Sequence, residues 1–240
     1  MEASNERKDE RDTDNPLIPL DINMINATKS VCKIIVKGTN GTGFLLKAFK
    51  NNKEFYCLIT NEHIITKDMI DNKEKIIIYY DTENEFREIT LNKDKRFIKE
   101  YRIINIDITL IEILNEDNIN KRYFLLPYMD NNNIINNNIY IIQYPHGNLC
   151  YSKGKIININ KYEIEYDVNT KEGSSGSPIF LENTKLVIGI HKQGDKKKKV
   201  NYGDLLYPII IDLKPQLNYT NGNYYKGDII DGKAHGKGIL

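Results

Sequence analysis

The stretch Gly173-Ser174-Ser175-Gly176-Ser177-Pro178 stands directly before a short apolar run and decides how the rest of the chain is interpreted. A glycine two residues before a serine permits backbone torsions that turn successive N–H groups into one small space. The N–H groups of Gly173 and Ser175 would then stabilise the negative oxygen of a tetrahedral intermediate, as an oxyanion hole does. By itself, the hexapeptide is equally compatible with an ordinary Gly-Ser loop.

A catalytic serine also needs a base, because its hydroxyl is a weak nucleophile at neutral pH. The chain has four histidines. His63 follows the apolar run 55–60 in a short turn, which would present its imidazole at the end of a sheet. A lone histidine in such a place is more often a satisfied surface or core residue, so its candidacy comes from the combination with Ser175.

Besides the serine and the histidine, catalysis needs an acidic residue that orients the histidine ring. Asp107 stands at the start of the apolar run Ile108-Thr-Leu-Ile-Glu-Ile113, where it would be partly buried and costly without a partner. A histidine N–H is such a partner, and the carboxylate would fix the tautomer of the ring. Taken alone, an aspartate here is more often a turn or strand-entry residue.

Short β-branched and aromatic runs separated by Gly, Asn, Asp and Pro predict an all-β fold. Six runs precede the region of Pro127 and six follow it, which predicts two similar β units, each closed into a barrel to remove exposed edges. The expected strands are 31–37, 43–49, 55–60, 75–80, 87–91 and 107–114, then 139–144, 155–159, 163–166, 177–181, 185–191 and 206–213.

In that order, His63, Asp107 and Ser175 resemble the catalytic residues of the chymotrypsin-like (trypsin fold) serine peptidases. Thr-Asn-Glu-His63 is similar to the family's Thr-Ala-Ala-His, Asp107-Ile-Thr-Leu-Ile to Asp-Ile-Ala-Leu, and the serine hexapeptide to Gly-Asp-Ser-Gly-Gly-Pro. The resemblance implies two six-stranded antiparallel β-barrels of chymotrypsin type, the first carrying the histidine and the aspartate. It also implies a serine endopeptidase that forms an acyl-enzyme on polypeptide substrates and needs no metal or cofactor.

The segment 166–180, followed by Val-Ile-Gly-Ile-His191, resembles the glutamyl-endopeptidase branch of this family. The resemblance implies that Thr170 and His191 bind the substrate, with an acidic residue before the cut. If a charged His191 binds the carboxylate of that residue, the preference for an acidic residue should weaken as the pH rises above the ordinary histidine pKa of about 6.5. Lys192 and Gly194 lie in the strand expected to pair with the substrate backbone, where Lys192 would narrow the pocket or add a positive charge.

The composition changes from about residue 217. The segment that follows resembles a MORN repeat, with that family's spacing at Tyr225, Gly227, Gly232, His235, Gly236 and Gly238. The resemblance implies a C-terminal β-hairpin and contacts with protein or phospholipid. One repeat does not bury its own face. We therefore expect that the native chain continues past residue 240 or that the hairpin docks elsewhere.

We expect four parts: a disordered charged head (1–24), a barrel with His63 and Asp107 (25–118), a barrel with Ser175 (119–216) and the MORN-like hairpin (217–240). A net charge of +1 gives no global field that would concentrate nucleic acid. No window is apolar enough to span a membrane, and no secretory signal is visible. Three cysteines within apolar runs fit buried free thiols and a cytoplasmic protein.

Two other functions compete with peptide hydrolysis. The chain would be an interaction protein if MORN hairpins target it and its barrels bind a peptide without cutting it. Intact His63, Asp107 and Ser175 argue against this alternative. An esterase with the same nucleophile is the third candidate, and comparing ester with amide substrates separates it from a peptidase.

Overall fold

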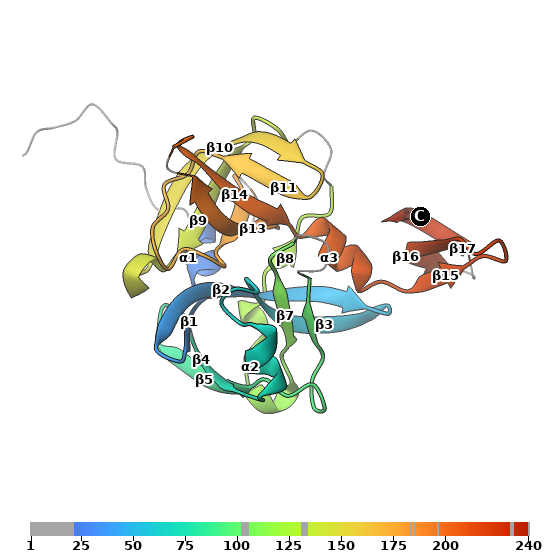
Figure 1. Ribbon diagram of the computed structural model, residues 1–240, viewed down its shortest axis with the longest axis horizontal. Helices are drawn as coiled ribbons and strands as arrows, with labels where there is room; N and C mark the ends of the chain where they lie inside the picture. Colours follow the sequence, from blue (N-terminus) through green and yellow to red (C-terminus); the bar gives the residue numbers. More distant parts are fainter. Residues whose placement is uncertain are drawn as a thin grey trace, which may run out of the picture.

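The computed structural model describes residues 22–101, 106–130, 134–182, 184, 186–195, 197–230 and 233–239. They form two large β-sheets that lie one above the other in Figure 1, and a small sheet that projects to one side at the C-terminal end. The all-β class expected from the sequence is confirmed, with antiparallel pairing throughout both large sheets except at one short strand.

The first sheet has seven strands in the order β5-β4-β1-β2-β3-β7-β6. Alternating burial shapes its strands: in β4, Ile76, Ile78 and Tyr80 face the core, while the residues between them are partly exposed. The strands are β1 (Val31–Val36), β2 (Thr39–Lys50), β3 (Lys53–Thr60), β4 (Lys75–Tyr80), β5 (Glu85–Thr90), β6 (Ile98–Glu100) and β7 (Thr109–Glu112).

The second sheet closes on itself, because β12 pairs with both β9 and β13. Six strands form this barrel, and a short parallel strand, β8, lies outside it against β13. The first sheet differs from the expected six-stranded barrel, since no pairing among the described residues joins its ends, β5 and β6. The strands are β8 (Leu126–Pro127), β9 (Asn138–Gln143), β10 (Cys150–Asn160), β11 (Glu163–Tyr166), β12 (Pro178–Leu181), β13 (Leu186–Asp195) and β14 (Val200–Leu205).

One expected strand is wrong: residues 206–213 hold a helix, α3 (Tyr207–Asp212). Pro208 lies in its first turn, where the missing N–H costs no hydrogen bond, and three isoleucines after it are buried. The other helices are α1 (Ile22–Thr28) and α2 (Lys67–Asp71), and single 3-10 turns are η2 (Asn115–Asp117), η3 (Lys121–Tyr123) and η4 (Pro145–Gly147). None of the helices within the described ranges is long and apolar enough to cross a membrane.

The two sheets share a packed core. One buried cluster contains Phe44 and Leu46 of β2 together with Phe180 of β12 and Ile190 of β13, and each of these is 0% exposed. Two further clusters fill the interiors of the individual sheets. Because the common cluster spans the boundary, the loops at that boundary are held in fixed relative positions.

The C-terminal sheet is a meander of β15 (Gln216–Asn218), β16 (Tyr224–Ile230) and β17 (Lys233–Ile239). The Tyr225 ring covers Gly227 and Gly238, where a Cβ would lie 2.3 Å from ring or hydroxyl atoms. Lys226 reaches back to Asp212 of α3 at 2.5 Å, which ties the sheet to the second barrel. The expected β-hairpin is present, and its resemblance to a MORN repeat stays a prediction.

The predicted head over residues 1–24 lies outside the described residues up to residue 21, and α1 begins inside its range at Ile22. The remaining domain boundaries stay predictions. The cysteine prediction holds for Cys32 and Cys57, which are buried, whereas Cys150 is exposed. Burial raises the pKa of both buried thiols, so neither is a reactive thiolate at neutral pH.

Candidate active site

His63 and Asp107 come together at one end of the first sheet. β3 and β7 are antiparallel with Thr60 opposite Thr109, so the chain that leaves β3 and the chain that enters β7 meet at the same edge. His63 lies three residues after Thr60, and Asp107 lies two residues before Thr109. The side-chain amide of Asn61 donates to the Asp107 carbonyl at 2.7 Å and holds the two segments together.

The carboxylate of Asp107 is hydrogen-bonded to His63 through both of its oxygens. Its Oδ2 lies 2.6 Å from the ring Nδ1, and its Oδ1 accepts the backbone N–H of His63 at 3.1 Å. Burial would raise the pKa of Asp107, but hydrogen bonds and charge from His63 outweigh burial and lower it. Because the carboxylate is ionised, Nδ1 carries the ring proton. The Nε2 lone pair is therefore left to act as a base.

Ser175 comes from the second sheet, in the loop between β11 and β12, and lines the same cavity as His63 and Asp107. The cavity has a volume of about 890 Å³. The Ser175 hydroxyl donates a long 3.4 Å hydrogen bond to the Lys192 carbonyl. No hydrogen bond joins Ser175 Oγ to His63 among the described residues. The structure thus brings the three side chains to one cavity and pairs two of them.

Thr42 of β2 holds the serine loop from the opposite sheet. Its N–H donates to the Ser175 carbonyl at 2.9 Å, and its hydroxyl donates to the Gly173 carbonyl at 2.7 Å. Gly176 has a φ of +88°, and a Cβ there would lie only 1.8 Å from the Thr42 carbonyl oxygen. Only glycine therefore lets the loop approach β2 this closely. Sequence reasoning did not assign Thr42, which lies between Gly41 and Gly43.

The orientation of the Gly173 N–H follows from the hydrogen bond of the carbonyl in the same peptide unit. In the same peptide plane, the Glu172 carbonyl accepts the N–H of His146 at 2.8 Å. The described residues contain no cis peptide bonds, and the N–H and C=O of a trans peptide point in opposite directions. The Gly173 N–H therefore points away from His146. It has no hydrogen-bond partner among the described residues.

The N–H of Ser175 is oriented in the same way. The Ser174 carbonyl accepts both the N–H of Ser177 at 3.1 Å and its hydroxyl at 2.6 Å. The Ser175 N–H belongs to that peptide plane and points away from Ser177. Like the Gly173 N–H, it is unpaired within the described part of the chain. Two unpaired N–H groups beside a serine hydroxyl are the arrangement that stabilises an oxyanion.

The expected substrate-binding residues line the same cavity. The Thr170 hydroxyl donates to Asn201 Oδ1 at 2.8 Å. A Cβ on Gly194 would lie 2.7 Å from that same oxygen, so glycine keeps this wall open. Lys192 Nζ lies 3.6 Å from Glu163 and from Asp204. The ammonium is thus engaged by two carboxylates.

His191 is buried, with 3% of its surface exposed. Its Nδ1 lies 2.5 Å from the Tyr166 hydroxyl. Burial lowers the pKa of His191 to about 3, with a smaller contribution from His63. The expectation that His191 titrates near pH 6.5 is therefore wrong, because burial disfavours the imidazolium and no carboxylate among the described residues is hydrogen-bonded to its ring.

Asp204 is a further residue at the site that sequence reasoning missed. It lies on β14, is 1% exposed, and its Oδ2 accepts the backbone N–H of Asp107 at 2.8 Å. Burial raises its pKa, opposed by the hydrogen bond from Asp107 and by the charge of Lys192. This hydrogen bond from the second sheet thus helps to fix the segment that carries Asp107. The sequence gives no signal for this contact, since Asp204 looks like any polar residue after a glycine.

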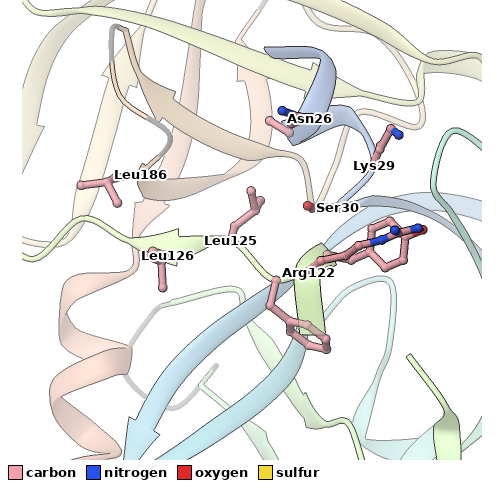
Figure 2. A pocket seen from close by; sticks show the side chains of 10 residues that line it. Asn26, Lys29, Ser30, Arg122, Leu125, Leu126 and Leu186 are labelled. Carbon is pink, nitrogen blue, oxygen red and sulfur yellow. The ribbon is translucent and has the colours of Figure 1, made fainter. Parts of the chain in front are cut away.

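A second cavity, of about 490 Å³, lies between α1, η3, β8 and the start of β13 (Figure 2). Its lining includes the charged residues Lys29 and Arg122 and the apolar residues Leu125, Leu126 and Leu186. His63, Asp107 and Ser175 are absent from its lining. The chemistry described above therefore belongs to the larger cavity.

Two β-sheets with these residues in a cavity between them place the chain in the class of chymotrypsin-fold proteins. A model of the trypsin-like peptidase domain matches residues 41–190, more than half of the chain. The chain belongs to this family.

The curated relatives are bacterial proteins named glutamyl endopeptidase. One from Staphylococcus epidermidis is 34% identical over 91 residues, which cover 35% of this chain and 32% of that protein. One from Staphylococcus aureus strain MW2 is 41% identical over 64 residues, which cover 25% and 19%. The matched region thus spans a third or less of each relative.

Solved structures agree in fold. A Glu endopeptidase in complex with MPD has a TM-score of 0.58 at 19% identity and covers 78% of this chain and 88% of its own. Deg5 has a TM-score of 0.59 at 15% identity with the same coverage. A serine endoprotease from Yersinia pestis has a TM-score of 0.59 at 14% identity and covers 80% and 65%.

Proposed function

We propose that the chain is a serine endopeptidase in which Ser175 is the nucleophile, His63 the general base and acid, and Asp107 the residue that orients the histidine. The observation that carries the proposal is the 2.6 Å contact between His63 and Asp107, facing the same cavity as Ser175. The contact fixes the ring tautomer that leaves Nε2 unprotonated, which a serine nucleophile requires.

The first half of the reaction forms the acyl-enzyme. Ser175 Oγ attacks the carbonyl carbon of the scissile bond as His63 Nε2 takes the hydroxyl proton. The oxygen of the tetrahedral intermediate then accepts hydrogen bonds from the N–H groups of Gly173 and Ser175. As the C–N bond breaks, His63 gives its proton to the leaving amine, and the acyl group stays on Ser175.

The second half releases the acyl group. Water attacks the ester carbonyl while His63 Nε2 takes one of its protons, and the same two N–H groups stabilise the second intermediate. The bond to Ser175 Oγ then breaks, and the proton returns from His63 to the serine. Asp107 stays ionised throughout and stabilises the charged imidazole.

Substrate selection belongs to the cavity wall beyond Ser175. Thr170, His191 and Gly194 offer a polar recess for the side chain before the cut, and the Lys192 backbone lies beside the nucleophile. The acidic preference expected from the sequence is one candidate, because a carboxylate accepts hydrogen bonds from a hydroxyl and an imidazole. A carboxamide is the other.

One observation favours the alternative function, a trypsin-fold protein that binds peptides without cutting them. Ser175 Oγ is directed at the Lys192 carbonyl and not at His63. A rotation about the serine Cα–Cβ bond is a small change, and catalytic hydrogen bonds often tighten only when substrate is bound. Peptide hydrolysis therefore remains the better account.

Contacts of the C-terminal sheet with protein or phospholipid, and a cytoplasmic location, remain separate proposals. Lys214, just before the sheet, and Lys226, within it, are both paired with aspartates, Asp228 and Asp212. The three thiols are free, which agrees with a reducing compartment.

A peptide library digested by the full chain tests the function. We expect cleavage by wild type and a loss on the order of a millionfold in turnover in Ser175→Ala. His63→Ala should lose activity to a similar extent, whereas His235→Ala, at an exposed histidine in β17, should not. Equal cleavage by wild type and Ser175→Ala would show that another group or a contaminant performs the reaction.

A further inference from the structure

The pocket beside Ser175 is built around a buried tyrosine and histidine. Tyr166 is 0% exposed and His191 is 3% exposed. The Tyr166 hydroxyl and His191 Nδ1 lie 2.5 Å apart, with the two rings edge to face. His191 lines the cavity. Because Nδ1 is occupied by Tyr166, Nε2 is the ring nitrogen that remains for a substrate.

The direction of this hydrogen bond follows from the requirement that the buried Tyr166 hydroxyl donate its proton to an acceptor. Among the described residues, the Tyr166 hydroxyl has no hydrogen-bond partner except His191. A buried hydroxyl without an acceptor costs about 1–3 kcal/mol, so the hydroxyl donates to Nδ1. Nδ1 is then unprotonated and Nε2 carries the proton. Protonating Nδ1 as well would leave the tyrosine proton without an acceptor, and the low pKa of His191 agrees with this conclusion.

The other polar side chains of this cavity wall, Thr170 and Asn201, present oxygen atoms that accept hydrogen bonds. Asn201 Nδ2 donates to the Val168 carbonyl, which orients the amide, and its Oδ1 accepts the hydroxyl proton of Thr170. Thr170 has one proton to donate and has given it to Asn201. Thr170 Oγ1 and Asn201 Oδ1 are therefore acceptors, and His191 Nε2–H is a donor.

The charges around the cavity do not favour an anion. The lining holds three lysines and four carboxylates, a formal surplus of one negative charge when histidines are counted as uncharged. Lys192 is engaged by Glu163 and Asp204. Burial raises the pKa of Tyr166, with a further contribution from the charge of Asp204. Of the remaining cavity lysines, Lys171 and Lys199 are exposed. The lining carboxylates are Asp107, Asp167, Glu172 and Asp195.

We propose that this pocket selects glutamine over glutamate before the scissile bond, with His191 donating from Nε2 to the side-chain carbonyl and Tyr166 holding His191 in that form. A carboxamide supplies one acceptor and two donors, which match a wall of one donor and two acceptors. A carboxylate supplies acceptors alone and would face Thr170 Oγ1 and Asn201 Oδ1 without a proton between them. The inference rests on the proposed hydrolysis at Ser175.

Matched peptides that differ only at the residue before the cut test this preference. With wild type at pH 7.5 we expect kcat/KM for glutamine to exceed that for glutamate by about tenfold or more, since a site built for hydrogen bonds rejects a mismatched polar group strongly. Leucine and lysine peptides, which cannot make these hydrogen bonds, should be poorer still.

Tyr166→Phe tests the role of the tyrosine with a minimal change in shape. We expect its glutamine-to-glutamate ratio to fall to within about threefold, because without the Tyr166 hydroxyl the His191 ring also adopts the Nδ1–H tautomer, in which Nε2 does not donate to the glutamine carbonyl. Tyr140→Phe is the matched control: Tyr140 is another buried tyrosine of the second barrel, bonded to the Thr184 carbonyl at 3.3 Å. Its ratio should stay that of wild type.

NMR of the histidine rings gives a readout apart from activity. The ring whose signals disappear in His191→Gln should remain the Nε2–H tautomer from pH 8 to pH 5 in wild type, whereas Tyr166→Phe should also populate the Nδ1–H tautomer. Titration of that ring near pH 6.5 in wild type would overturn the inference.

The kinetic outcomes separate the two proposals. A wild type that cleaves glutamate peptides as well as or better than glutamine peptides, or that prefers leucine or lysine, overturns the inference and leaves the hydrolytic function in place. An absence of any cleavage that depends on Ser175 refutes both.

Discussion

Gly176→Ala should damage the active site without touching any group that reacts. The new Cβ would lie 1.8 Å from the Thr42 carbonyl oxygen, so the two must separate by about 1.2 Å to reach even a tight 3.0 Å contact. A residue other than glycine at this positive φ adds about 1–2 kcal/mol. Because Ser175 precedes Gly176 directly, the displacement falls on the nucleophile and its N–H.

A misplacement of about 1 Å costs on the order of 100-fold in rate, so we expect at least that loss in kcat. Gly38→Ala provides the control, because Gly38 has a similar φ of +79° in the β1–β2 turn but nothing within 4 Å of the added Cβ. The control should lose about 1–2 kcal/mol of unfolding free energy and keep its kcat. Both quantities are measured by peptide kinetics and urea unfolding. Equal kcat for Gly176→Ala and Gly38→Ala would refute the reasoning.

Further predictions concern Asp204, Asp107 and the three thiols. Asp204→Ala leaves the Asp107 N–H unpaired, and should cost about 1–3 kcal/mol of unfolding free energy and about tenfold or more in kcat. Asp204→Asn keeps an acceptor for that N–H and should recover most of both losses. Identical behaviour of the two variants would contradict this. Asp107→Asn should lower kcat by about 10⁴ by removing the ionised carboxylate. The pKa of Asp107 is lowered in the fold, so the stability that its charge contributes is present above about pH 4 and is lost as the pH falls through the folded pKa. The unfolding free energies of wild type and Asp107→Asn, measured in urea, should therefore converge in acid. Ellman's reagent should modify one thiol of the native chain quickly, Cys150, and Cys32 and Cys57 only after unfolding; three fast thiols would show that the buried pair is accessible.

The strands were largely predictable because β-branched runs bounded by turn residues have few alternatives. The runs 75–80 and 163–166 coincide with β4 and β11. The helix α3 was missed because its three isoleucines resemble a strand, and the decisive feature is where Pro208 falls in the first turn. β14 was missed because Asn201, Gly203 and Asp204 break its apolar pattern.

The candidate site divides in the same way. His63, Asp107 and Ser175 lie in local motifs, and the sequence alone marks them. Asp204 and Tyr166 act through contacts with residues 97 and 25 positions away, and pairings so distant in the sequence have no local pattern. The neutral state of His191 follows from its burial, which depends on the packed fold and not on the Gly-Ile-His motif.

The central claim is that His63 activates the Ser175 hydroxyl. Reaction of the full chain with a fluorophosphonate, followed by peptide mapping in a mass spectrometer, tests it most directly. The account predicts one phosphonyl group on Ser175 in wild type, and none above background in His63→Ala or Ser175→Ala. Equally rapid modification of Ser175 in His63→Ala, or attachment to Ser174 or Ser177 in the native chain, would contradict it.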